Sequence, residues 1–312
     1  MNWTELDTWI VITGVLICLA CVLPGAFLML NRQSMLGDGI SHAVLPGLAV
    51  AFLLTNSRDI LPMILGAVIA GVLTALLTQL VQRFGQVESG AALGVVFCGL
   101  FATGLILIRV ASDKVDLDAD CVLYGSIETA VVDVNRVPRV TLISGGLLLA
   151  NALLTILFYK ELRISAFDPA LATTLGFNAE FIRLGLTIVS SVTTVLAFES
   201  VGSILVIAML VVPAAAASLL TRRLNVMLCL ALAFAGASAV LGHIGAITLP
   251  QLAGRLLNQP GIGATSSAAM MAVAAGVLFV IAWFISIFWD KRKASTVVAS
   301  AVSNGRDPKS NG

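Results

Sequence analysis

Apolar residues gather into long continuous runs along the chain, and short polar stretches separate these runs. A helix that spans the hydrocarbon core of a bilayer needs about 20 apolar residues. The runs cover residues 10–30, 40–56, 60–82, 91–109, 140–159, 184–198, 200–220, 226–249 and 266–289. The pattern predicts an all-α, polytopic membrane helix bundle.

Two of these runs, 40–56 and 184–198, are shorter than a full span. The run at 184–198 is also separated from the next one by a single charged residue, Glu199. These two neighbouring runs form either one broken helix or a tight hairpin. The sequence therefore predicts eight or nine transmembrane helices.

The composition is that of a membrane protein. Hydrophobic residues make up 59% of the chain and charged residues 11%, with a mean hydropathy of +1.02. A soluble domain carries about 25% charged residues, so this chain cannot cover a water-facing surface. The net charge of +1 does not suggest a nucleic-acid partner.

The five cysteines do not indicate a disulfide framework, because their number is odd and most of them lie in apolar runs. Cys18 and Cys21 have the spacing of a metal-binding pair. No second pair lies nearby, so the sequence favours ordinary packing within a helix.

The distribution of charge predicts the orientation in the membrane. The acidic start "MNWTELDTWI" lacks the basic region of a signal peptide, so the first run is expected to remain as a span. Short loops on the cytoplasmic side carry an excess of Lys and Arg. This rule favours an N-terminus outside and a C-terminus in the cytoplasm.

The chain divides into a transmembrane domain over residues 1–293 and a tail over 294–312. The tail is small, polar and unpatterned, and it is predicted to be a disordered cytoplasmic segment. No polar stretch is long enough for a catalytic domain, and no GxxxxGK[ST] phosphate loop is present. The chain is therefore not expected to be an enzyme, and any energy must come from a gradient or from a partner chain.

One acid and one histidine stand four residues apart in the stretch "GDGISHAVLPG". Asp38 and His42 share one face of a helix at this spacing. Three interpretations are open. In the first, the Asp38 carboxylate stabilises the start of the helix and His42 is a hydrogen-bonded interior residue. In the second, the two side chains are ligands for Mn²⁺, Fe²⁺ or Zn²⁺, and in the third they relay protons.

Two further residues are weaker metal candidates. His243, in "LGHIGAITLP", lies toward the outer end of the eighth run, where packing is the simpler interpretation. Glu199 lies close to the outer surface in the predicted topology. It is either a solvated loop charge or an acid at the mouth of a pore.

A short helix is predicted on the cytoplasmic side, between the fifth and sixth runs. Asp168 and Pro169 form an N-cap followed by proline at the first helical position. Gly176 suits the residue just beyond the helix end. The helix over 169–175 either only joins two spans or docks a soluble partner.

Four motifs in order resemble the ABC-3 permeases, the membrane subunits of manganese, zinc and iron ABC importers. They are "MLGDGISHAVLPGLAVAFLL", "AFDPALATTLGF", "ESVGSILVIAMLVVPAAAASLLTRRL" and "GIGATSSAAMMAVAAGVLF". The likeness extends from about residue 10 to residue 290. At Glu199 the sequence departs from the neutral or amide residue of the family pattern.

The resemblance implies a bacterial cytoplasmic (inner) membrane protein that works as a dimer of like or paired permease chains. It implies two cytoplasmic ABC ATPase subunits and an extracytoplasmic metal-binding protein as partners, with the divalent metal as cargo and not as a permanent cofactor. The family's metal path matches Asp38 and His42. Its ATPase coupling helix matches Asp168, Pro169, Ala170 and Gly176.

Three alternatives remain open at this point. A proton-coupled secondary transporter would use Asp38 and His42 to carry protons. An ABC permease for a vitamin or an iron chelate would need a wider pore, in which a buried Asp–His pair is an unusual lining. A membrane scaffold would fold without an ATPase partner.

Overall fold

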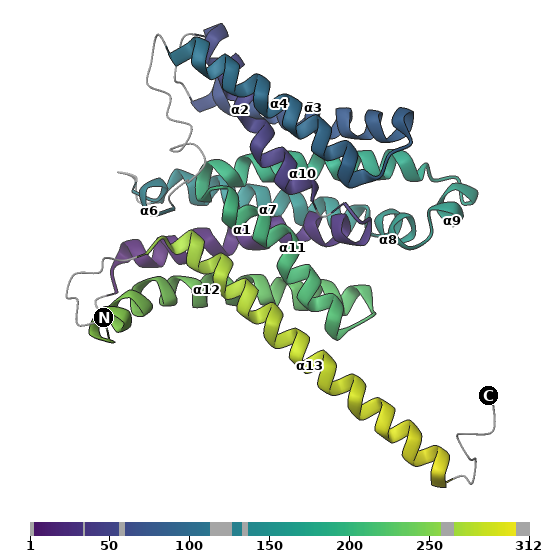
Figure 1. The fold of residues 1–312 in the computed structure, drawn as a ribbon. Helices are drawn as coiled ribbons and strands as arrows, with labels where there is room; N and C mark the ends of the chain where they lie inside the picture. Colours follow the sequence, from purple (N-terminus) through teal and green to yellow (C-terminus); the bar gives the residue numbers. More distant parts are fainter. Residues whose placement is uncertain are drawn as a thin grey trace.

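The computed structural model describes residues 3–33, 35–55, 60–112, 127–132, 137–256 and 265–303. Over these residues the chain forms helices and no strand, as the sequence predicts (Figure 1). The long helices are α1 (Glu5–Leu30), α2 (Leu36–Thr55), α3 (Ile60–Gly85), α4 (Ser89–Ser112), α7 (Arg139–Leu157), α10 (Ala179–Val201), α11 (Ser203–Leu220), α12 (Leu224–Leu256) and α13 (Ser267–Ser303). The short helices are α6 (Ile127–Ala130), α8 (Tyr159–Phe167) and α9 (Pro169–Thr174).

Each of the nine predicted runs coincides over most of its length with one of the long helices. Within the described residues, eight helices are long and apolar enough to span a membrane. The remaining run belongs to α2, of which Pro46–Thr55 is a shorter apolar stretch. The first turns of α2 carry Asp38 and His42.

The helices form two packed groups with α10 between them (Figure 1). In one group α2, α3 and α4 pack on one another. In the other, α1 contacts α7, α11 and α12, and α13 packs on α11 and α12. Helix α10 contacts both α3 and α1, so it connects the two groups.

Polar side chains at the centre of the bundle join α10 to its neighbours. The Asn151 amide of α7 donates hydrogen bonds to the Ala20 carbonyl oxygen of α1 at 3.0 Å and to Thr193 Oγ1 of α10 at 2.9 Å. Both Asn151 and Thr193 are buried. In lipid, where apolar side chains gain little by leaving the solvent, such hydrogen bonds and close packing hold helices together.

Helices α2 and α3 cross at two glycines. A Cβ atom added at Gly47 would lie 2.3 Å from the Gly66 carbonyl oxygen, and one added at Gly66 would lie 2.5 Å from the Gly47 carbonyl oxygen. Only residues without a side chain allow two helix backbones to approach so closely. This crossing fixes the position of α2 against the bundle.

The join between α10 and α11 is a single glycine. Gly202 has φ 80° and ψ 169°, a conformation that is essentially restricted to glycine. Glu199 therefore lies in the last turn of α10, and the prediction of a loop charge at this position is wrong. The helix is longer than its apolar run because Asn178 Oδ1 caps its start, accepting from the Glu180 and Phe181 amides.

The two ends of the bundle carry different elements. The N-terminus and α6 lie at one end, whereas α8 and α9 lie at the opposite end (Figure 1). Helix α13 continues to Ser303, so residues 294–303 are helical and differ from the predicted disordered tail. Residues 304–312 lie outside the described part of the chain.

Candidate functional site

Asp38 and His42 form an open pair on α2. The His42 Nε2 atom lies 3.6 Å from Asp38 Oδ1, one helical turn away. The distance exceeds that of a strong hydrogen bond, so neither group is saturated by the other. Side-chain exposure is 57% for Asp38 and 31% for His42, and both groups are therefore accessible from outside the single chain.

Two aromatic rings of α4 hold the imidazole of His42. The ring centroids of Phe97 and Phe101 lie 5.2 Å and 5.9 Å from that of His42. These phenylalanines occupy the middle of α4, so the imidazole lies at the depth of the membrane-spanning helices. The buried His42 Nδ1 atom makes no hydrogen bond to the described residues, and Nε2 is the nitrogen that faces Asp38.

The spacing of the two atoms suits a single metal ion. Two ligands that hold one ion tetrahedrally at ordinary Zn–N and Zn–O distances stand about 3.4 Å apart, close to the observed 3.6 Å. In the described part of the chain no three His, Cys, Asp or Glu side chains gather into a metal cluster. The pair therefore offers two ligands and leaves the remaining positions open, as suits an ion that must be released.

The second histidine has a closed environment at the opposite end of the spans from α9. His243 of α12 is 2% exposed, and its Nδ1 atom lies 3.1 Å from Ser267 Oγ of α13. Its Nε2 atom lies 3.3 Å from Asp7 Oδ1 of α1, which is an ion-pair distance although the angle is poor for a hydrogen bond. The Trp3 ring covers the imidazole edge-on at 5.6 Å.

A further acid completes this second cluster. The Ser267 amide donates a 2.6 Å hydrogen bond to Glu128 Oε1 of α6. Helices α1, α6, α12 and α13 therefore meet through these polar contacts near Ser267, the first residue of α13. The packing interpretation of His243 accounts for these contacts, and a metal role is not needed to explain its burial.

The remaining candidates lie on other helices than the Asp38–His42 pair. Glu199 stands in the last turn of α10, and its side chain lies outside the described part of the structure. Cys18 and Cys21 are free, fully buried thiols in the hydrophobic core, as the packing interpretation predicts.

The predicted cytoplasmic helix is present as α9, with the predicted caps. Asp168 Oδ1 accepts a 2.9 Å hydrogen bond from the Leu171 amide, and Pro169 is the first helical residue. At the other end Gly176 has φ +88°, and the Gly176 and Phe177 amides bond to the Thr173 and Ala172 carbonyl oxygens. This is the Schellman arrangement, which favours glycine at that position.

Helix α9 presents an apolar surface at the end of the bundle. Only Ala172 of this helix is buried, whereas Ala170 is exposed. The exposed large apolar side chains on and beside it are Phe167, Leu171, Leu175 and Phe177. Clustered exposed apolar side chains mark a contact surface, and these lie where the spans end.

Two features of these sites could not be predicted from the sequence. The contact of His42 with Phe97 and Phe101 joins helices that are far apart in sequence, and the apolar run at 91–109 contains nothing that singles out these two rings. Asp7 was visible only as part of an acidic N-terminus. Its spacing in the sequence carries no signal of a partner at His243.

The arrangement defines a class of protein: a multi-pass membrane protein with an open acid–histidine pair among its helices and a short helix with an exposed apolar surface at one end. A family model, the ABC 3 transport family, matches residues 4–286. The chain belongs to this family. It is the permease, the membrane subunit of an ATP-binding-cassette importer, and ATP hydrolysis takes place on a separate partner chain.

Known proteins resemble the chain over most of its length. The manganese transport system membrane protein MntD of Bacillus subtilis (strain 168) is 42% identical over 282 residues, which are 87% of this chain and 94% of that protein. The zinc transport system membrane protein TroD of Treponema pallidum (strain Nichols) is 41% identical over 209 residues, 65% of this chain and 57% of that protein.

A solved structure has the same fold. PsaBC from Streptococcus pneumoniae in complex with Fab matches with a TM-score of 0.70 and 30% identity, over 90% of this chain and 92% of that chain. The resemblance found in the sequence motifs is therefore confirmed at the level of the family and the fold.

Proposed function

We propose that this chain is the permease of an importer for a divalent transition metal, manganese or zinc, and that Asp38 and His42 are transient ligands on the metal path. The relatives named above are described as manganese and zinc systems. Iron stays a prediction from the sequence resemblance. In this proposal the metal is cargo, bound at the pair and then released.

The observation that carries the proposal is an exposed ionisable pair at membrane depth. A charged side chain facing lipid is costly, so such groups face a bundle interior or a watery path. Asp38 is more than half exposed on the single chain, and its neighbour His42 packs against the middle of α4. The open side of the pair therefore faces a passage or a second permease chain, either of the same or of a related sequence.

The arrangement of the ends supports the proposed orientation. Helix α9 has the exposed apolar surface that an ATPase subunit would cover, so its end of the bundle is assigned to the cytoplasm. The N-terminus lies at the opposite end (Figure 1). This assignment agrees with the excess of basic residues on the cytoplasmic side and puts the N-terminus outside, where a metal-binding protein would deliver the ion.

In the proposed cycle the ion enters from the extracytoplasmic side and exchanges water for Asp38 Oδ1 and His42 Nε2. Closure of the ATPase subunits moves α9, which is joined to α10 by only a few residues. Because α10 contacts both packed groups of helices, its movement can shift one group against the other. This is a rocking transition between two states.

The test is metal uptake by proteoliposomes that contain the assembled transporter with its binding protein. Asp38→Asn and His42→Ala are expected to lose uptake while the chain is present at normal amounts. Glu88→Gln, which removes an exposed acid outside the pair, is the matched control and is expected to retain uptake. Normal uptake by the Asp38 and His42 variants would exclude the proposed ligand role.

The same assay separates the proposal from a proton-coupled transporter. An importer driven by ATP continues in the presence of an uncoupler and stops when ATP is depleted. Uptake that stops with the uncoupler and continues without ATP would assign Asp38 and His42 to proton transfer instead.

A further inference from the structure

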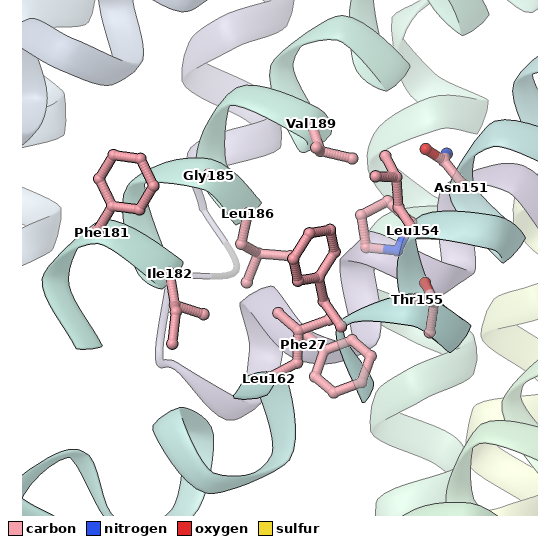
Figure 2. Close-up of a pocket in the computed structure, with 12 residues that line it drawn as sticks. Phe27, Asn151, Leu154, Thr155, Leu162, Phe181, Ile182, Gly185, Leu186 and Val189 are labelled. Carbon is pink, nitrogen blue, oxygen red and sulfur yellow. The ribbon is translucent and has the colours of Figure 1, made fainter. Parts of the chain in front are cut away.

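A cavity of about 200 Å³ lies where α1, α7, α8 and α10 meet (Figure 2), and neither Asp38 nor His42 lines it. The residues that line it include Phe27 of α1, Leu154 of α7, Leu162 of α8 and Gly185 of α10. Leu154 and Gly185 belong to two of the candidate membrane spans. Because Leu162 of α8 lies beyond the end of the α7 span, the cavity lies at the α8 end of these spans, at the edge of the bilayer.

Water is a poor occupant for this cavity. A buried water needs two to four polar partners. The Asn151 side chain, the most polar group of the lining, already bonds to the Ala20 carbonyl oxygen and to Thr193 Oγ1. The surface that remains is almost wholly apolar.

The cavity opens toward the outside of the bundle. Phe181 and Phe158 stand at its rim and are 72% and 47% exposed. An apolar opening at the edge of the bilayer is within reach of the lipid of the adjacent leaflet. The abundant apolar molecule at that place is the acyl chain of a membrane lipid.

We propose that this cavity is a binding site for one acyl chain of a phospholipid, which fills the space between α7 and α10 and supports α8 from the side of the membrane. Gly185 keeps the space open, because a Cβ atom added there meets nothing within 4 Å. A large side chain at this position points into free space and occupies the site without displacing the backbone. This site is independent of the metal path and of the proposed cargo.

The experiment uses the full chain in phospholipid vesicles that contain a phosphatidylglycerol with a photoreactive diazirine on one acyl chain. Cross-linked peptides are mapped by mass spectrometry. In the wild type, labelling of segments 151–162 and 181–189 should exceed that of the exposed faces of α3. In Gly185→Phe this excess should fall to the level of α3, and in Gly146→Phe, a control on an exposed face of α7 with equally free space, it should persist.

A second measurement covers the case in which the large side chain impairs folding. Ligands that bind the folded state raise its melting temperature. Added phospholipid should raise the Tm of the delipidated wild type and of Gly146→Phe, and raise it less in Gly185→Leu, which folds with a smaller side chain in the cavity. An equal rise in all three proteins would overturn the site.

Two other results would also overturn it. One is labelling of the two segments that never exceeds the labelling of α3. The other is an excess that is present in the isolated chain and absent from the transporter assembled with its partners, because a protein surface would then cover the opening. None of these readouts involves metal transport, so their failure leaves the proposed function standing.

Discussion

The chain contains two Asp–His pairs with nearly the same separation and opposite surroundings. Asp38 and His42 are 3.6 Å apart, open, and joined to the rest of the bundle by aromatic contacts. Asp7 and His243 are 3.3 Å apart, and His243 is 2% exposed, with Ser267 on its other nitrogen. Residue type and distance therefore do not distinguish a ligand pair from a structural pair.

What differs is the number of partners that each imidazole has within the chain. The buried pair lies at the meeting point of α1, α6, α12 and α13, where every neighbouring group contributes to holding helices together. The open pair belongs to a single helix, and His42 Nδ1 has no described hydrogen-bond partner. A site that must bind and release an ion needs coordination positions that the ion can reach, and the open pair is the more exposed of the two.

The largest effect is expected from the open pair. Asp38→Asn and His42→Ala should lower metal uptake by more than about tenfold, because removing even an outer-shell partner of a metal ligand commonly costs that much. The melting temperature of the chain should stay close to that of the wild type, since neither side chain is saturated by contacts. Uptake by proteoliposomes and thermal unfolding of the same preparations check both parts.

The second largest effect is expected at the crossing of Gly47 and Gly66, which positions the helix that carries Asp38 and His42. Gly66→Leu should destabilise the chain by about 3 kcal/mol, the upper part of the range for overpacking, because the added atoms meet the Gly47 backbone. Uptake should fall with it, since α2 is displaced. Denaturant unfolding measures the change, and Gly276→Leu on α13, where a Cβ atom has free space, should change little. Equal stability of the two variants would contradict the role of the crossing.

The buried pair should show the reverse pattern to the open pair. His243→Ala leaves the Ser267 hydroxyl without its partner, whereas Asp7 keeps its hydrogen bonds from Thr4. An unsatisfied buried polar group costs about 1 to 3 kcal/mol. Uptake per folded molecule should be retained. A variant that unfolds like the wild type but has lost uptake would place His243 on the metal path and remove the distinction between the pairs.

The smallest expected effect comes from Asp7→Asn, which keeps the size of the side chain and some of its hydrogen bonding. Interhelical polar contacts in membrane proteins contribute about 0.6 kcal/mol on average, and a loss of that order is expected in the free energy of unfolding. Asp38→Asn should lower metal uptake and leave the free energy of unfolding close to that of the wild type. Comparing these two isosteric variants in one assay sharpens the contrast between the pairs.

The sequence predicted those features that depend on local pattern. The apolar runs predicted the long helices, and the residues Asp168, Pro169 and Gly176 predicted the caps of α9, because capping is a property of neighbouring residues. The Asp-x-x-x-His spacing predicted that Asp38 and His42 share a face. All of these follow from helix geometry alone.

The remaining features depend on contacts between distant segments. The sequence spacing of Glu199 suggested a loop, but the break falls at Gly202, where the backbone requires glycine. The partners of His243 come from α1 and α13, and the rings beside His42 come from α4. No periodicity along the chain reports which faces of two helices meet, so these contacts became visible only in the folded structure.

The most direct test of the central claim is electron paramagnetic resonance of Mn²⁺ bound to the assembled transporter, with ¹⁵N-histidine in the permease chain alone. The chain has only 2 histidines, so a nitrogen coupling can be assigned by substitution. The account predicts a ¹⁵N coupling in the wild type and in His243→Gln, and its loss in His42→Gln. A coupling that persists in His42→Gln, or bound Mn²⁺ without any histidine coupling in the wild type, would contradict it.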